Sequence, residues 1–468
     1  MLHLSLLVVY SVALIAVGLW MSRAVRGSAD FFVAGRSLSA PLLFSTVLAA
    51  NIGAGTTIGA AGLAYRDGIS AWWWNGSAAI GSLGLAFLVG PRIWRVAVAH
   101  NLYTVGDYLE LRYNRTVRGI IAALTWCGTL SILAGQLIGG AAILTTVAGV
   151  PRTVGIIASA LVMTTYFVAG GLLSSAWVNL VQLIVLLGGF AVAVPLVVAG
   201  AGGLQTFGEA ATTQPHVVDF FFSSGARSGW TFLFLLAPSF IISPGLLQKA
   251  YGAKDVPTLR RGLGWQALAQ AIFGLLPALL GMSARLTHPG ITDPNLVLPT
   301  VLIEQLPTAL SALALAAVFS AEVSTCDAIL FMLSTSLSQD LYRRFLKPEA
   351  TDEQLVRVAR LAAVVGAVGG VLLALRLPTV TSALGVFYSL LSVTLFVPVL
   401  GGLFVTRATT RDALAAVVCG GGTALLLLLV AHGSAWWLDP AVLGLAAAAV
   451  GFCLSLATRR PRIATAAM

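Results

Sequence analysis

The chain has 468 residues, of which 58% are hydrophobic and 9% charged, and its formal net charge is +10. Soluble domains do not have this composition, and runs of about 20 apolar residues recur from end to end, which is typical of an α-helical protein with many membrane spans. Outer-membrane barrels are excluded, because their strands alternate polar and apolar residues.

We predict one integral domain in the lipid bilayer, with about 13 transmembrane helices and no soluble domain. The first span is expected to be retained, because it lacks the basic start and the cleavage site of a signal peptide. The expected spans lie near residues 3–20, 40–64, 72–94, 117–148, 153–171, 174–199, 229–248, 263–283, 306–338, 356–375, 379–405, 412–431 and 440–457.

The basic residues indicate topology. If the N-terminus is outside and the loops alternate, the cytoplasmic side receives all 27 Lys and Arg except Arg66, Arg152, Arg227, Arg285 and Arg376. Cytoplasmic loops of membrane proteins are enriched in Lys and Arg. We therefore predict a multi-pass protein of the cell (inner) membrane with its N-terminus outside and its C-terminus in the cytoplasm. No nucleic acid and no obligatory protein partner is expected.

Two spans are poor helices in their middles: STVLAANIGAGTTIGAAGLAY (45–65), with four glycines, and FLFLLAPSFIISPGLLQKAY (232–251), with two prolines. Glycine weakens a helix, and proline removes a backbone hydrogen bond. In lipid, a broken backbone persists only where protein or a water-filled cavity satisfies the freed groups. Either span alone is equally well explained by small residues that permit close packing.

The spacing of the two broken spans favours a functional explanation. If residues 1–22 form an extra N-terminal helix, the broken spans are the first and sixth of the remaining twelve. We then predict two five-helix units within 39–405, two C-terminal helices within 411–457 and a cytoplasmic tail at 458–468. Interrupted helices in corresponding places point to the central site of a transporter, where unwound carbonyls hold a cation.

The stretch AEVSTCDAIL (321–330) places Glu322 and Asp327 inside an apolar span. Such acids are costly in lipid and usually face a cavity or the bundle interior. At about 100° per residue, Ser324 and Thr325 share a face with Ala321, and the two acids flank that face on opposite sides. The acids are therefore not a catalytic pair. Glu322 is expected to be a neutral, hydrogen-bonded acid, to meet a cationic solute or to carry a proton, and Asp327 to act near an ion.

Several stretches resemble the sodium:solute symporters, the family of bacterial proline, sialic acid and sugar symporters. They are DFFVAGRSL (30–38), TVGDYLELRYN (104–114), GGLLSSAWVNLVQ (170–182), LLQKAYGAKD (246–255) and AEVSTCDAILFMLSTSLSQDLYRRF (321–345). The resemblance implies an all-α polytopic membrane protein with the LeuT-type fold, a 5+5 inverted repeat. It also implies Na+ as the coupling ion.

The sodium ligands that the resemblance implies are the backbone carbonyls of Ala49, Ile52 and Ala321 and the hydroxyls of Ser324 and Thr325. Hard cations prefer oxygen ligands, which fits this set. The two hydroxyls by themselves are explained as well by bonds to carbonyls one turn earlier. Many family members carry an acid in a W-T-D-x-x-Q stretch that is tied to a second sodium. Here the stretch is WVNLVQ, with Asn179, which puts that second site in doubt unless Asp327 supplies the charge.

We expect a sodium-coupled secondary-active symporter that imports a small polar organic solute by alternating access, and no enzymatic activity, because no nucleophile–base pair or metal motif appears. Two alternatives remain: a proton-coupled symporter that uses Glu322 or Asp327, and a sensor that binds solute without moving it. Amino acids, monocarboxylates, vitamins and sugars all fit as solutes. The candidate solute or coupling residues are Asn51, Asn75, Asn179, Ser239, Phe240, Ser243, Glu322 and Asp327.

Overall fold

The computed structural model describes residues 2–21, 36–221, 229–430 and 439–458. These residues form helices, and extended pairing among them is limited to an isolated bridge between Leu38 and Ala253. The predicted tail beyond residue 458 and most of the DFFVAGRSL stretch lie outside the described residues. The all-helical fold expected from the sequence is confirmed.

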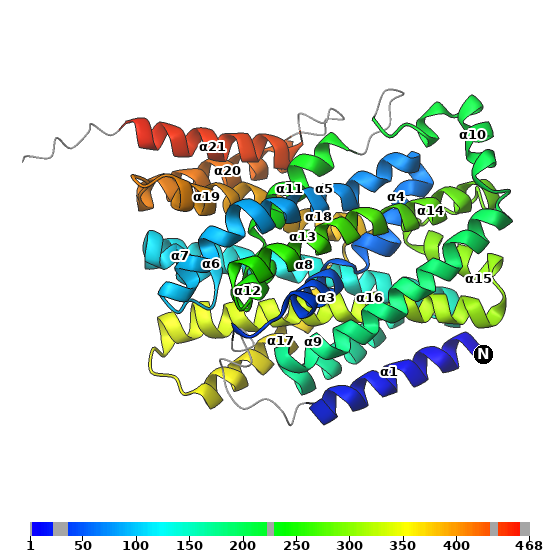
Figure 1. The fold of residues 1–468 in the computed structure, drawn as a ribbon, viewed down its shortest axis with the longest axis horizontal. Helices are drawn as coiled ribbons and strands as arrows, with labels where there is room; N and C mark the ends of the chain where they lie inside the picture. The colour runs from blue at the N-terminus through cyan, green and yellow to red at the C-terminus, as the bar shows by residue number, and fades with distance from the viewer. Residues whose placement is uncertain (1, 22–35, 222–228, 431–438, 459–468) are drawn as a thin grey trace, which may run out of the picture.

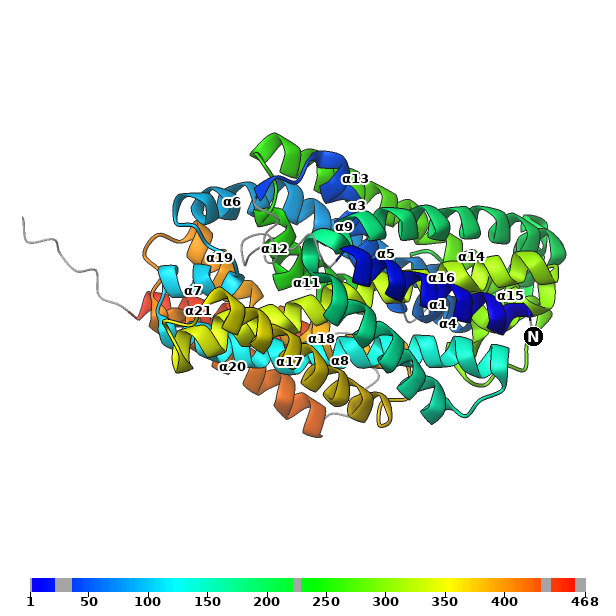
Figure 2. The ribbon, with the colours of Figure 1, turned by 90° about the horizontal axis from the view of Figure 1, so that it is seen from below.

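The helices run along the long axis of the molecule (Figures 1 and 2). Helix α1 lies at one edge and α20 and α21 at the opposite edge, while α7 lies at one end and α10 and α15 at the other (Figure 1). The helices are α1 (Leu2–Met21), α3 (Ala40–Asn51), α4 (Ala60–Asp67), α5 (Trp72–Gly84), α6 (Gly90–Ala99), α7 (Val105–Arg112), α8 (Arg115–Ala148), α9 (Arg152–Gly200), α10 (Leu204–Thr213), α11 (Trp230–Ile242), α12 (Pro244–Tyr251), α13 (Val256–Phe273), α14 (Leu275–Thr287), α15 (Val297–Gln305), α16 (Thr308–Thr335), α17 (Asp352–Ala374), α18 (Val380–Thr394), α19 (Phe396–Phe404), α20 (Thr410–Val430) and α21 (Pro440–Ala457).

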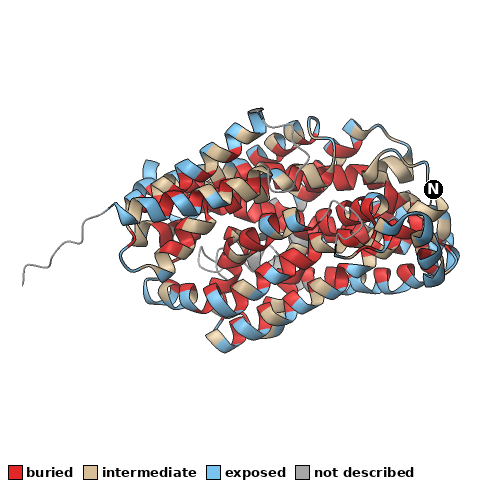
Figure 3. Cartoon of the chain, turned by 90° about the horizontal axis from the view of Figure 1, so that it is seen from above, coloured by how far each residue is buried: buried red, intermediate tan, exposed pale blue. Residues whose placement is uncertain are grey.

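Within the described residues, 10 helices are long and apolar enough to cross a membrane. Three further apolar helices are shorter: His3–Ala13, Ala40–Asn51 and Arg152–Thr165. Buried residues fill the interior, and exposed ones line the outside of the bundle (Figure 3). Many of these exposed side chains are large and apolar, such as Leu161 and Val181. An apolar exterior around a packed interior is what a bilayer requires of a multi-span protein.

Helix α9 differs from the prediction, because it is one helix of 49 residues where the sequence predicts the two spans 153–171 and 174–199. Arg152 at the start of α9 donates to the Leu377 carbonyl, next to Pro378, whose carbonyl accepts from Asn295. Gly200 at the end of α9 lies beside Gln305 of the same region, so the chain bends back within α9. The region between the expected spans has no proline, and glycine is common inside membrane helices. Helical backbone therefore continues through it.

Both predicted helix breaks are confirmed. Helix α3 ends at Asn51, the next residue Ile52 has an extended ψ of 92°, and the chain re-enters α4 through a π-helical turn, Gly55–Gly59. Helix α11 ends before Ser243, whose ψ is 123°, and α12 restarts with Pro244. Proline suits the first position of a helix, where its missing N–H would have no partner within the helix.

The extra N-terminal helix packs against the helix that carries the AEVSTCDAIL stretch. The Tyr10 hydroxyl of α1 donates to the Ser320 hydroxyl of α16 over 2.5 Å, and the His3 ring lies 3.0 Å from the Ser311 hydroxyl. At the opposite edge, Gly420 of α20 and Gly444 of α21 both lie against Val393 of α18. These contacts attach both ends of the chain to the central helices.

We expect Gly281→Ala to lower the melting temperature of the purified protein. A Cβ atom at this position of α14 would lie 2.1 Å from the Ala61 carbonyl oxygen of α4. The two helices would have to separate, at a cost of about 1–3 kcal/mol. Gly188→Ala is the matched control, because nothing lies within 4 Å of the added Cβ. Equal melting temperatures for the two variants would contradict this account of the α4–α14 contact.

Candidate functional site

Four of the five predicted ligand oxygens lie together between α3 and α16. The Ser324 hydroxyl lies 3.0 Å from the Ala49 carbonyl oxygen and 2.9 Å from the Ala321 carbonyl oxygen. The Thr325 hydroxyl lies 3.1 Å from the same Ala49 oxygen. Two hydroxyls and two carbonyls from different helices thus form one oxygen cluster in which every side chain is buried.

The fifth predicted ligand, Ile52, follows the last residue of α3. Its extended ψ turns the carbonyl away from the helical direction, as a ligand from a broken helix requires. Next to it, Gly53 leaves room for the cluster: a Cβ there would lie 2.5 Å from the Thr325 hydroxyl oxygen and 2.6 Å from the Gln136 amide oxygen. The approach of α16 to the break therefore depends on this glycine.

Side chains replace the missing helical hydrogen bonds of the break. The Ala54 N–H donates to the Gln136 amide oxygen of α8 over 2.9 Å. The Thr56 hydroxyl donates to the Asn51 carbonyl over 2.6 Å, and the Thr57 hydroxyl to the Gly53 carbonyl over 2.9 Å. Because backbone groups need partners in a membrane, these contacts stabilise an interruption that would otherwise be costly.

A central cavity lies between the two breaks. Of the predicted solute residues, Asn51, Phe240 and Ser243 line it. Its other walls come from α8, α16 and α18 and include Gln136, Thr325, Phe331, Met332, Phe387 and Tyr388. A small cavity with a few amide and hydroxyl groups among aromatic and aliphatic walls is typical of small-molecule sites.

Two predicted solute residues, Asn75 and Ser239, are not among the residues that line the cavity. The Asn75 amide donates to the Thr56 carbonyl over 3.3 Å, so it supports the first break. The Ser239 hydroxyl lies 2.7 Å from the Tyr388 carbonyl and 3.0 Å from the Ser392 hydroxyl, which joins α11 to α18. Sequence position near a break did not reveal which way these side chains point.

Glu322 and Asp327 are buried on α16, as the sequence predicts, but neither is among the residues that line the cavity. Both carboxyl oxygens of Glu322 are without a hydrogen-bond partner among the described residues. They face α8, since a Cβ at Gly139 would lie 2.8 Å from one oxygen and a Cβ at Gly140 3.4 Å from the other. The expected hydrogen bond of Glu322 to a neighbouring helix is therefore not found among the described residues. Asn179 is also buried and does not line the cavity.

Lys249 is a site residue that the sequence reasoning missed. Its ammonium group donates to the Thr46 carbonyl over 2.6 Å, joining α12 to α3, and it is the charged side chain among the described residues that line the cavity. Asp327 lies near enough to act electrostatically on it. The available signal was a basic residue only five positions after Pro244, inside a broken span, where a charge needs a partner.

A chain of amides also escaped prediction. The Asn51 amide donates to the Gln270 side-chain oxygen over 3.2 Å, and the Gln266 amide donates to the same oxygen over 2.6 Å. Gln266 and Gln270 are one turn apart on α13 and are buried. Two buried amides at i and i+4 in an apolar span could have indicated this contact with the break.

Comparison with known proteins identifies the family to which the chain belongs. The sequence profile of the sodium:solute symporter family matches residues 31–420. The chain is 26% identical to the sodium/glucose cotransporter of Vibrio parahaemolyticus, over 88% of this chain and 82% of that protein. It is 28% identical to the sodium/pantothenate symporter of Escherichia coli K12, over 84% and 82% of the two chains. A solved Na+-coupled sialic acid symporter in a substrate-bound outward-open state has the same fold, with a TM-score of 0.83 and 19% identity over 98% of both chains.

The fold and the oxygen cluster between broken helices define a multi-pass membrane transporter, and the profile match covers most of the chain. The chain belongs to the sodium:solute symporter family, as its motifs suggested. The family and the relatives are transporters, so the expectation that the protein is not an enzyme is confirmed.

We expect sodium to raise the melting temperature of the purified protein and Gly53→Ala to abolish that rise. The added Cβ would collide with the Thr325 hydroxyl and the Gln136 amide, forcing α16 away from the break. A ligand that binds only the folded state stabilises it by mass action, so loss of the binding site removes the rise in melting temperature. Gly188→Ala serves as the control. Retention of the full sodium shift in Gly53→Ala would contradict the placement of the site.

Proposed function

We propose that this protein is a sodium-coupled secondary-active symporter that imports a small polar organic solute by alternating access. The observation that carries the proposal is the oxygen cluster of Ala49, Ala321, Ser324 and Thr325 at the break after α3. With the Ile52 carbonyl it offers five neutral oxygens to Na+, the hard cation that such ligands suit.

The geometry favours sodium over a proton at this site. The cluster consists of carbonyl and hydroxyl oxygens, which do not bind protons at neutral pH but keep lone pairs for a metal cation. The named relatives transport with sodium, which supports the same ion here. Sodium at the cluster would hold α3 and α16 together, so it would favour the conformation in which these helices touch.

The solute is proposed to bind in the central cavity, next to the sodium site. Thr325 belongs to both the oxygen cluster and the cavity wall, so ion and solute would share one boundary. Asn51, Gln136 and Lys249 supply hydrogen-bond donors, and Phe240 and Tyr388 supply apolar walls. A wall common to both sites would couple the binding of sodium to the binding of solute, because each ligand favours the conformation that the other needs.

We propose the 5+5 inverted repeat within 39–405 with about 13 spans, the helix at 1–22 as an addition and two further helices within 411–457. With α9 counted as two spans, the two breaks fall in the first and sixth core spans, which supports this division. We also propose insertion in the cell (inner) membrane with the N-terminus outside. In support, α7 and α10, which belong to loops assigned to opposite sides, lie at opposite ends of the molecule (Figure 1).

We expect Ser324→Ala and Thr325→Ala each to raise the sodium concentration that gives half-maximal solute uptake by at least about tenfold, which corresponds to about 1.4 kcal/mol of lost binding. Each change removes one of five oxygens. Thr394→Ala is the matched control, because Thr394 is also buried and its hydroxyl donates to the Leu390 carbonyl of its own helix. Unchanged sodium dependence in both site variants would rule out the assignment.

We expect an impermeant maleimide to label Glu209→Cys from outside intact cells and to label Glu349→Cys only after permeabilisation. Both positions are exposed, in α10 and in the segment before α17. The prediction follows from the distribution of Lys and Arg between the loops. The reverse labelling pattern would overturn the proposed orientation while leaving the fold unaffected.

A further inference from the structure

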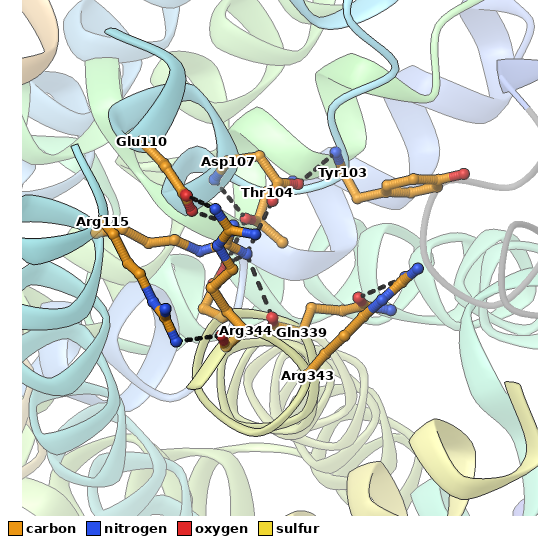
Figure 4. A network of polar contacts seen from close by, with 10 residues as sticks. Tyr103, Thr104, Asp107, Glu110, Arg115, Gln339, Arg343 and Arg344 are labelled. Carbon is orange, nitrogen blue, oxygen red and sulfur yellow. Dashed lines mark hydrogen bonds and ion pairs between the residues drawn. The ribbon is translucent and has the colours of Figure 1, made fainter. Parts of the chain in front are cut away.

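A buried ion cluster ties α7 to α8 and to the π-helical end of α16 (Ser336–Leu346, η8). The Arg118 guanidinium of α8 lies 2.8 Å from Asp107 and 3.0 Å from Glu110 of α7, and 2.7 Å from Asp340 of η8. Its side chain is only 7% exposed. Figure 4 shows this network, in which Glu110 and Arg344 reach toward one another. One arginine therefore links three elements through three carboxylates.

The contact between α7 and η8 is close as well as charged. The Thr104 hydroxyl donates to an Asp340 carboxyl oxygen over 2.6 Å. A Cβ at Gly106 would lie 2.5 Å from the same oxygen, so the two elements meet only because this residue is glycine. Asp107 also accepts the backbone N–H groups of Tyr103 and Thr104, which fixes the start of α7. These backbone hydrogen bonds hold the Asp107 carboxylate in position beside Arg118.

Cavities lie on both sides of this cluster. An inner cavity is lined by Thr104, Thr125, Gln248, Thr335 and Asp340, and it shares Met332 with the central cavity. An outer cavity is lined by Asp107, Glu110, Arg118, Gln339 and Arg343. Asp340 lines the inner cavity and Arg118 lines the outer cavity, so the ion pair between them separates the two cavities. The cluster therefore stands between the central cavity and the end of the molecule that carries α7.

We propose that this ion cluster is the gate that closes the solute's route between the central cavity and the α7 end of the protein, and that separation of α7 from η8 opens it. The proposal rests on the proposed transport function, which requires such a route. It goes beyond the sodium and solute sites, since no residue of the cluster belongs to either.

A charged contact suits a gate better than an apolar contact does. Desolvation of buried ion pairs offsets most of their attraction, so a charged contact gives little net preference for the closed state. When α7 moves away, water solvates the charges and recovers that cost. Burial raises the pKa of Glu110, but the hydrogen bonds and charges of Arg344 and Arg118 outweigh burial and leave the pKa below its ordinary value. Glu110 is therefore ionised at neutral pH and available to both arginines.

The test uses a thiol at Thr335 in the inner cavity, introduced as Thr335→Cys after Cys127, Cys326, Cys419 and Cys453 have been replaced by serine. A small charged methanethiosulfonate reagent is applied to the α7 side of membrane vesicles, and the labelling rate is measured. With the cluster intact we expect slow labelling, and with Asp340→Ala a rate at least about tenfold higher. Glu353→Ala is the control, because it breaks an exposed ion pair with Arg357 on α17, and it is expected to leave the rate unchanged.

A second variant, Gly106→Ala, retains every charge and pushes α7 from η8 by steric contact alone. We expect it to raise the labelling rate as well, and it decides the question if Asp340→Ala fails to reach the membrane. Fast labelling with the cluster intact, or unchanged slow labelling in both variants, would overturn the gate. The readout needs neither sodium nor solute, so failure of the gate can be told from failure of the proposed symport.

Discussion

A backbone amide or carbonyl that leaves its helix inside a membrane must find another partner, and this constraint governs the centre of the molecule. Lipid offers no hydrogen bonds, so each interrupted helix needs polar side chains from its neighbours. Gln136 supplies one to the Ala54 N–H, and Asn75 supplies one to the Thr56 carbonyl. Polar side chains of neighbouring helices thus replace the helical partners that the break removes.

The same constraint produces the oxygen cluster that is proposed to bind sodium. Once α3 ends at Asn51, its last carbonyls point where no amide of the next turn can reach them. The Ala49 carbonyl instead receives the hydroxyls of Ser324 and Thr325. A bound cation and the hydrogen of a donating hydroxyl both place positive charge next to the carbonyl oxygen. The proposed binding of sodium would therefore need only a change of partners within a cluster that the break has already assembled.

The sequence allowed prediction of those parts of the site that depend on local chemistry. Glycines and prolines disclosed both breaks, and helical spacing put Ala321, Ser324 and Thr325 on one face. Side-chain direction across helices was beyond such reasoning, as the orientations of Ser239 and Asn75 show. Lys249 and Arg118 were missed for a different reason: both were counted as loop charges that set topology, although both are buried. The sequence analysis expected two separate spans, 153–171 and 174–199, where α9 has uninterrupted helical backbone.

The bond between Lys249 and the Thr46 carbonyl has a mechanical consequence. It fastens the half-helix that follows one break to the half-helix that precedes the other, although more than two hundred residues separate them in the chain. A bond from α12 to the middle of α3 leaves the two half-helices with fewer independent motions than they would have without it. The half-helices α3 and α12 would therefore move together, so a displacement of α3 at the oxygen cluster would also displace the cavity wall that α12 forms.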